Sequence, residues 1–348
     1  MRDILPDVEA WLAQGRRVAL GTVVATWGSA PRAAGSCMGM SDDGGLTGSV
    51  SGGCVEAAVI DAAREILKGA PPRLLRFGVA DETAWAVGLA CGGRIEVFVE
   101  ALDPQVFASL RAAVLRDEPM ALATVIDGPA RELARHAVLD AAGALSGSLE
   151  GAWRAWAQPA LVEALATARS ARVPVEGGEL FVDVLRPLPT LIVVGGVHIA
   201  VALVALARTL GFRTVVVDPR SAFANKERFP HADRLESGWP DEALTRIGLT
   251  SSTAVAVLTH DPKLDDPALR AALPSPAFYV GALGSRGTQA KRRQRLLEAG
   301  LAEAQVDRLR APIGLDLGGR SPEEIALSVM AEVVAARHGR ARSRDLTA

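Results

Sequence analysis

The residues with the clearest capacity for chemistry lie in segment 47–56, TGSVSGGCVE. Its cysteine, Cys54, follows two small hydroxyl residues and two glycines, which are Ser49, Ser51, Gly52 and Gly53. Apolar residues recur at helical spacing over 57–68, so we expect Cys54 at or near a helix N-terminus. Unpaired backbone N–H groups at such an end favour an anion and stabilise a thiolate. The segment predicts a thiolate beside an oxyanion cradle, with a buried structural cysteine on a Gly-rich turn as the alternative.

The other cysteines, Cys37 and Cys91, form no C-x-x-C pair with Cys54 or with each other. This spacing favours neither a disulfide framework nor a zinc ribbon, and reduced thiols fit a cytoplasmic protein. Cys91 and Gly92 begin a second Gly-rich turn, which could face the same pocket as Cys54. Cys37 lies in a predicted hairpin and is interpreted as structural. Arg32 is a candidate for a phosphate contact.

The chain of 348 residues has the composition of a globular protein, with 49% hydrophobic and 22% charged residues. Its length predicts two domains, or three. A net charge of -2 and the lack of a stripe of basic and aromatic residues argue against a nucleic-acid partner, and the basic run 291–295 is interpreted as a solvated helix face. The start of the chain has no signal-peptide pattern, and the uncharged run 191–207 is too short to span a membrane. We therefore expect a cytoplasmic protein.

Strand and turn patterns predict a mixed α/β domain over residues 1–186. An apolar, β-branched run at 18–25 precedes a predicted hairpin at 36–49, and 94–100 alternates as a further strand. Residues 120–185 resemble a degenerate second copy of this unit, because the sequence ALATV there echoes ALGTV in the first strand.

The two copies differ at the cysteines. In the alignment of the copies, Cys54 corresponds to Trp153 and Cys91 to Glu176. A second copy that keeps the scaffold and lacks both thiols is what a functional site on a duplicated fold would leave.

Residues 190–348 predict a Rossmann-like, doubly wound parallel sheet after a Pro-rich linker. A strand at 190–194, a Gly-rich turn, a helix and a strand ending at Asp218 form a βαβ unit with the spacing expected of a ribose-binding carboxylate. The final helix begins with a capping box at Ser321 and Glu324. Val197 stands where the dinucleotide fingerprint has a glycine, so a bound nucleotide and an empty Rossmann fold both remain open. The candidate nucleotide-binding residues are Gly195, Gly196, His198, Asp218, His260, Asp261, Gly284, Ser285 and Arg286.

Several motifs taken together resemble the XdhC/CoxI family of xanthine dehydrogenase accessory factors. They are GSVSGGCVE at 48–56, GLACGG at 88–93, THDP at 259–262, GALGSR at 281–286 and PIGLDLG at 312–318. The resemblance implies a homodimeric chaperone that binds the molybdenum cofactor, molybdopterin with its metal. It would protect the cofactor while a cysteine desulfurase supplies the sulfido ligand, and insert it into an apo-xanthine dehydrogenase or related molybdenum hydroxylase.

The same resemblance, together with the soft character of a thiolate, makes Cys54 a candidate molybdenum ligand. The cofactor-binding candidates are Cys54, Gly52, Gly53, Ser51, Ser49, Cys91, Gly92 and Arg32. We therefore expect a maturation protein and not an enzyme.

Two other functions remain as alternatives. One is an NAD(P)-dependent oxidoreductase built on the Rossmann half, although Val197 interrupts the fingerprint and Tyr279 is the single tyrosine, without an evident Tyr-Lys pair. The other is a thiol redox switch that uses Cys54 and Cys91.

Overall fold

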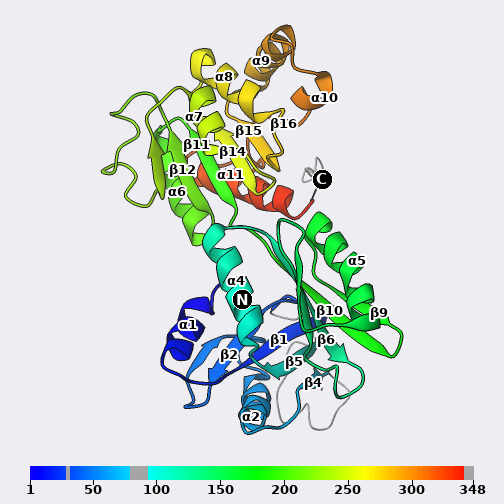
Figure 1. Ribbon diagram of the computed structural model, residues 1–348. Coiled ribbons are helices and arrows are strands. Elements are labelled where there is room, and N and C mark those ends of the chain that lie inside the picture. The colour runs from blue at the N-terminus through cyan, green and yellow to red at the C-terminus, as the bar shows by residue number, and fades with distance from the viewer. Residues whose placement is uncertain (29–31, 79–92, 341–348) are drawn as a thin grey trace. The chain divides into compact units, whose positions relative to one another are not determined.

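The computed structural model describes residues 1–28, 32–78 and 93–340, and these residues divide between two compact units, Met1–Pro187 and Leu188–Ala348. The first unit combines helices with antiparallel sheets, and the second has a parallel sheet flanked by helices (Figure 1). The predicted fold class, a mixed α/β part followed by a Rossmann-like part, is confirmed.

The first unit contains two five-stranded antiparallel sheets with the same strand order. One has the order β3-β2-β1-β5-β4 and the other β8-β7-β6-β10-β9. The first set is β1 (Val18–Trp27), β2 (Cys37–Ser41), β3 (Leu46–Gly48), β4 (Arg73–Phe77) and β5 (Arg94–Ala101). The second set is β6 (Met120–Asp127), β7 (His136–Leu139), β8 (Leu145–Gly147), β9 (Ala171–Val175) and β10 (Gly178–Leu185). We call residues 18–101 the first copy and residues 120–185 the second copy.

Each sheet buries one face under its own helix and turns the other face toward its counterpart. Helix α2 (Glu56–Leu67) covers the first sheet and α5 (Gly151–Thr167) covers the second, because each helix presents apolar residues to the alternate positions of its strands. The opposite faces meet in a small apolar cluster of Val24, Phe98, Ile126 and Phe181. We call the contact between these two inner faces the seam. Helices α1 (Leu5–Ala13) and α4 (Pro104–Arg116) pack around it.

One glycine in each copy fixes the end of the hairpin. Gly48 has φ +73°, and a Cβ atom there would lie 2.3 Å from the carbonyl oxygen of Cys37. Gly147 has φ +117°, and its Cβ would lie 2.4 Å from the carbonyl oxygen of His136. Only glycine meets both the backbone angle and the close approach.

The second unit has a six-stranded sheet of order β13-β12-β11-β14-β15-β16, in which the described pairs are parallel. Its strands are β11 (Thr190–Val194), β12 (Arg213–Val217), β13 (Arg234–Glu236), β14 (Thr253–Val257), β15 (Tyr279–Ala282) and β16 (Leu309–Arg310). Its helices are α6 (His198–Thr209), α7 (Pro240–Ile247), α8 (Pro262–Ala272), α9 (Arg286–Glu298), α10 (Glu303–Val306) and α11 (Pro322–Arg337).

Helices lie on both faces of this sheet, as a doubly wound fold requires (Figure 1). α6 and α11 pack on the face that carries Leu191 and Val193, whereas α7 and α8 pack on the face that carries Ile192 and Val194. The predicted capping box at the start of α11 is present. Within the described residues, no helix is long and apolar enough to cross a membrane.

Candidate functional site: the cysteine loop of the first copy

The loop 49–55, which joins β3 to α2, folds around the carboxylate of Glu56. Backbone N–H groups of Ser51, Gly52 and Gly53 donate to this carboxylate at 2.9, 3.0 and 2.9 Å. The amides of Val50 and Val55 add longer contacts at 3.3 and 3.2 Å. The hydroxyls of Ser49, at 2.8 Å, and of Ser51 also donate to it. Seven donors therefore converge on one side chain at the first position of the helix.

The electrostatics of Glu56 follow from these contacts. Burial alone would raise the pKa of the carboxyl group, but the Ser51 hydroxyl, the loop amides and the Ser49 hydroxyl stabilise the charged form and lower the pKa to about 2. Glu56 is consequently ionised at any ordinary pH, and it satisfies amides that precede the helix.

The predicted oxyanion cradle exists, but in this structure the anion it holds is the chain's own carboxylate. Gly52 and Gly53 donate their N–H groups to Glu56 and have φ of +80° and +121°. Both glycines are exposed, and no heavy atom lies within 4 Å of a Cβ built on either one. Their outer faces are therefore open, while their N–H groups are engaged.

Cys54 lies two residues before the first residue of α2, close to the predicted helix N-terminus. Its side chain is a free thiol of intermediate exposure that packs against the apolar cluster between α2 and the first sheet. The residue is thus neither fully buried in the core nor fully exposed.

The structure says less about the other cofactor-binding candidates. Cys91 and Gly92 lie outside the described residues. Arg32 is exposed, and the Asp3 carboxylate is a charged neighbour of it. Within the described residues, no three His, Cys, Asp or Glu side chains gather as a metal site.

The second copy has a different structure at the equivalent position. Trp153 lies six residues after Gly147, as Cys54 lies six residues after Gly48, but there the chain is already in helix α5. The Trp153 ring packs edge-on to Trp156, with 5.5 Å between ring centroids. It also lies over Gly128 and Gly178, whose added Cβ atoms would come within 3.0 and 2.9 Å of the ring. At this position the second copy has a packed indole and the first copy has a thiol.

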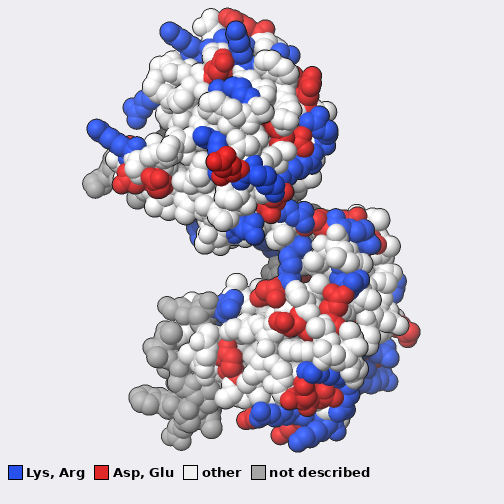
Figure 2. Space-filling view, turned by 90° about the vertical axis from the view of Figure 1, so that its left-hand side faces the viewer, with Lys and Arg blue, Asp and Glu red and all other residues white. Residues whose placement is uncertain are grey.

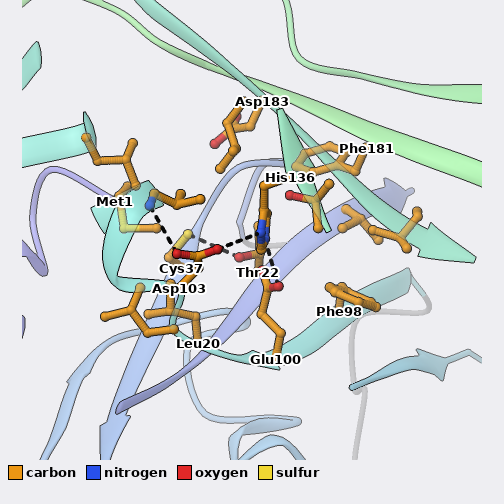
Figure 3. A pocket seen from close by; sticks show the side chains of 17 residues that line it. Met1, Leu20, Thr22, Cys37, Phe98, Glu100, Asp103, His136, Phe181 and Asp183 are labelled. Atoms are coloured by element: carbon orange, nitrogen blue, oxygen red, sulfur yellow. Dashed lines mark hydrogen bonds and ion pairs between the residues drawn. The ribbon is translucent and has the colours of Figure 1, made fainter. Parts of the chain in front are cut away.

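A cavity of about 30 Å³ lies between the inner faces of the two sheets, and its mainly apolar lining includes a few polar side chains (Figure 3). His136 from the second copy pairs with Glu100 from the first, with 2.9 Å between Nε2 and the carboxylate. Burial opposes the charge on the imidazole, but the carboxylates of Glu100 and Asp103 outweigh it and raise the pKa of His136. Cys37 lines the same cavity, where burial raises the pKa of its thiol. This environment agrees with the structural role predicted for Cys37.

Sequence reasoning did not single out His136 or Glu100. The strand registers pair Thr22 with Cys37 in one sheet and Thr124 with His136 in the other, so His136 is the second-copy counterpart of Cys37. The alignment of the copies, extended to the inward-facing positions, could have identified this cluster.

In the second unit, two of the residues expected to bind a nucleotide, Gly196 and Asp218, contact each other. The Asp218 carboxylate accepts the Gly196 N–H at 2.9 Å and the Arg220 side chain through Nε and Nη2 at 2.8 and 2.7 Å. Burial opposes ionisation, but the guanidinium and amide donors lower the pKa of Asp218. A ribose hydroxyl would have to compete with Arg220 for this carboxylate.

The chain itself also explains why residue 196 is glycine. A Cβ atom at Gly196 would lie 2.1 Å from the carbonyl oxygen of Phe223, and Arg228 donates to the Gly196 carbonyl at 3.0 Å. The Arg220 guanidinium stacks over the Phe223 ring, with 4.0 Å between its Cζ atom and the ring centroid. The close backbone approach at Gly196 is therefore made by segment 220–228 of the chain itself.

The remaining nucleotide-binding candidates lie at helix starts in the second unit. His198, His260, Asp261, Ser285 and Arg286 are exposed, Gly284 is half-buried, and Gly195, with φ +104°, is buried. Asp261 caps α8 by accepting the Lys263 N–H at 2.9 Å, and Ser285 caps α9. Asp261 and Ser285 therefore serve the local helix ends in this structure.

The basic run 291–295 does not form a purely solvated face. Arg292 is buried and donates to the buried carboxylate of Asp265 at 2.6 Å. It also donates to the Leu283 carbonyl at 3.1 Å, so it ties the loop after β15 to helix α8. Elsewhere, on the described part of the face in Figure 2, basic and acidic side chains are interspersed.

Comparisons with known proteins bear on both units. Residues 191–333 match the model of the XdhC Rossmann domain, and residues 11–78 match the model of the XdhC and CoxI family. The chain is 27% identical over 337 residues to a probable xanthine dehydrogenase subunit of Bacillus subtilis, covering 95% of this chain and 96% of the relative. It is 29% identical over 338 residues to the molybdenum cofactor insertion chaperone PaoD of Escherichia coli, covering 97% of this chain and 88% of the relative.

A solved structure from Bacillus halodurans, described as a xanthine dehydrogenase, has a TM-score of 0.74 to this chain and covers 98% of both chains at 24% identity. That likeness concerns the fold. The two family models match the cysteine loop with strands β1 to β4 and nearly the whole parallel sheet, and together they cover more than half of the sequence. On these grounds the chain belongs to the XdhC/CoxI family.

Proposed function

We propose that this protein is a cytoplasmic chaperone that binds the molybdenum cofactor through Cys54 and delivers it to a molybdenum hydroxylase of the xanthine dehydrogenase type. The names of two relatives support this role, since one is an insertion chaperone and the other is named for xanthine dehydrogenase. In the proposed role the cofactor is cargo, held while a cysteine desulfurase supplies its sulfido ligand and then released to the client enzyme.

The observation that carries the proposal is the partly exposed, free Cys54 on a loop that is held by hydrogen bonds to Glu56. Thiolates are soft ligands suited to a thiophilic metal, and the neighbouring glycines leave open space on their outer side. The second copy, which has the same sheet order, carries a tryptophan at this position. Because Glu56 already binds the loop N–H groups, we assign recognition of the cargo's phosphate to other residues.

The test is co-purification of the cofactor from cells that make it. The protein is isolated intact, its pterin is released and oxidised, and the fluorescent product is quantified per mole of chain. We expect pterin with the wild-type protein and little with Cys54→Ala or Cys54→Ser, because serine keeps the size of the side chain but removes the soft ligand.

Cys37→Ala is the matched control, since it removes a thiol that is buried in the seam. It should retain the pterin of the wild-type protein. A wild-type protein without pterin, or a Cys54 variant that keeps it, would contradict the proposal.

A further inference from the structure

We infer that Glu56 is the positioning residue of the cysteine loop: its carboxylate, bound by the backbone and hydroxyls of residues 49–55, holds Cys54 in the conformation that receives cargo. This inference rests on the proposed function for the identity of the cargo. The ordering of the loop by Glu56 does not depend on it.

The contacts show how much of the loop depends on one side chain. Five amides and two hydroxyls donate to Glu56, and they come from Ser49 through Val55. Cys54 lies between two of the donors, Gly53 and Val55. Its backbone is thus fixed on both sides, although its own side chain makes no part of the network.

The two serines act as secondary supports for the same arrangement. Ser49 accepts the Gly52 N–H at 2.9 Å while it donates to Glu56, and Ser51 accepts the Val55 N–H at 3.0 Å while it donates to Glu56. Each hydroxyl therefore links one end of the loop to the carboxylate. The glycines have no side chains to hold them and adopt positive φ angles, so the loop has little intrinsic preference for this shape.

The chemistry of the position requires a charged acceptor. A carboxylate can accept at all four lone-pair sites and offers no proton, whereas a carboxamide has one donor NH₂ group. That NH₂ group would face some of the seven donors, and the repulsion would release part of the loop. Hydrogen bonds to a charged group also contribute more than neutral ones.

The second copy supports the link between this residue and the loop. The residue eight positions after Gly147 is Ala155, while the residue eight positions after Gly48 is Glu56. Where alanine stands, the chain is helical from Gly151. Where glutamate stands, the helix begins later and residues 52–55 form the loop around the carboxylate.

The experiment measures loop order in the full-length protein without cargo. Hydrogen exchange of the amides in 50–55 and the rate of alkylation of Cys54 by iodoacetamide, read on its own peptide by mass spectrometry, are compared between the wild-type protein and Glu56→Gln. We expect faster exchange and alkylation about tenfold faster, the factor that corresponds to losing one charged hydrogen bond or more. Glu56→Asp keeps the charge and should restore much of the wild-type rate.

Glu65→Gln is the matched control. Glu65 lies on the same helix in an exposed ion pair with Arg73, so its loss should leave the loop unchanged. If Glu56→Gln reduces folding, Ser49→Ala removes one support without removing the charge, and it should accelerate alkylation of Cys54 by a smaller factor. Wild-type exchange and alkylation in Glu56→Gln, or an equal change in Glu65→Gln, would overturn the inference.

The readouts separate this inference from the proposed function. Pterin carried by the wild-type protein tests the function, and loop order in the cargo-free protein tests the role of Glu56. A disordered loop in Glu56→Gln without any pterin in the wild-type protein would uphold the positioning role and remove its cargo. Pterin in the wild-type protein with an unchanged loop in Glu56→Gln would do the reverse.

Discussion

The two copies in the first unit share a backbone scaffold and differ in the segment between hairpin and helix. Both sheets have the same strand order, and both hairpins end at a glycine that approaches a carbonyl of the neighbouring strand. After Gly48 the chain forms the loop around Glu56, whereas after Gly147 it enters α5 within four residues. The scaffold therefore depends on backbone geometry common to both copies, and the candidate site depends on a few side chains of one copy.

The exchange of a thiol for an indole shows what each copy gains. Trp153 covers two glycines and packs on Trp156, so it contributes apolar contact to the second copy. Cys54 is smaller and packs at the edge of the apolar cluster between α2 and the first sheet. In the first copy the position carries a partly exposed thiol, and in the second it carries a ring that adds to the packing.

The largest effects should come from the position that the copies share. Gly48→Ala and Gly147→Ala each place a Cβ within 2.4 Å of a carbonyl oxygen at a positive φ. Strain and overpacking together should lower the free energy of unfolding by about 3 kcal/mol in each variant. Thermal unfolding followed by circular dichroism checks this, and a cost in one copy only would break the equivalence of the scaffolds.

Substitutions in the seam should have the next largest effect on the free energy of unfolding, and the effect should differ between the two copies. Glu100→Ala leaves the buried imidazole of His136 without its hydrogen-bonded carboxylate and should cost about 2–3 kcal/mol. Asp183 is the second-copy counterpart of Glu100, since Leu122 pairs with Asp183 as Leu20 pairs with Glu100. It is partly exposed and accepts the Ser170 hydroxyl at 2.7 Å, so Asp183→Ala should cost about 1 kcal/mol. Denaturant unfolding of the two variants measures the difference, and equal costs would show that the seam is symmetric in energy as well as in register.

The cysteine and tryptophan positions should separate stability from binding. Trp153→Ala removes a half-buried indole and should cost about 2 kcal/mol, below the value for a fully buried ring. Cys54→Ala should change the free energy of unfolding by less than about 0.5 kcal/mol. Paired measurements of melting temperature and pterin content should give opposite rankings, with Trp153→Ala less stable but still able to retain pterin.

The sequence was sufficient to predict the classes of fold and the repeat. Strand alternation and the shared ALATV and ALGTV patterns mark the two copies, and the βαβ spacing up to Asp218 marks the parallel sheet, because burial on one face or on both leaves a periodic trace. The location of Cys54 beside a helix start was also predictable, since the apolar periodicity of α2 begins just after Gly52 and Gly53.

Side-chain partners could not be predicted in the same way. Glu56 lies two residues after the cysteine, yet nothing in the spacing shows that the chain turns back so that this carboxylate fills the cradle. The same is true of Asp218, whose spacing fits a ribose although its oxygens bind Gly196 and Arg220. Arg292 was expected in solvent because its neighbours are charged, and its pairing with Asp265 is a tertiary contact. A polar residue at a site can bind a ligand or the chain itself, and only the packed structure distinguishes the two.

The smallest expected effect concerns the pH dependence of the seam. The folded-state pKa of His136 lies above its ordinary value of 6.5, because two carboxylates outweigh burial. Its contribution to stability is therefore complete below pH 6.5 and is lost as the pH rises through the folded-state pKa. The difference in unfolding free energy between the wild-type protein and His136→Asn should shrink over that range, and the subtraction cancels the groups that both proteins share. In a Glu100→Gln background the same subtraction should give a weaker slope, because burial then opposes the charge with one carboxylate fewer. A pH-independent difference would contradict the raised pKa of His136 and would mean that the pair with Glu100 joins the two copies without a change of charge.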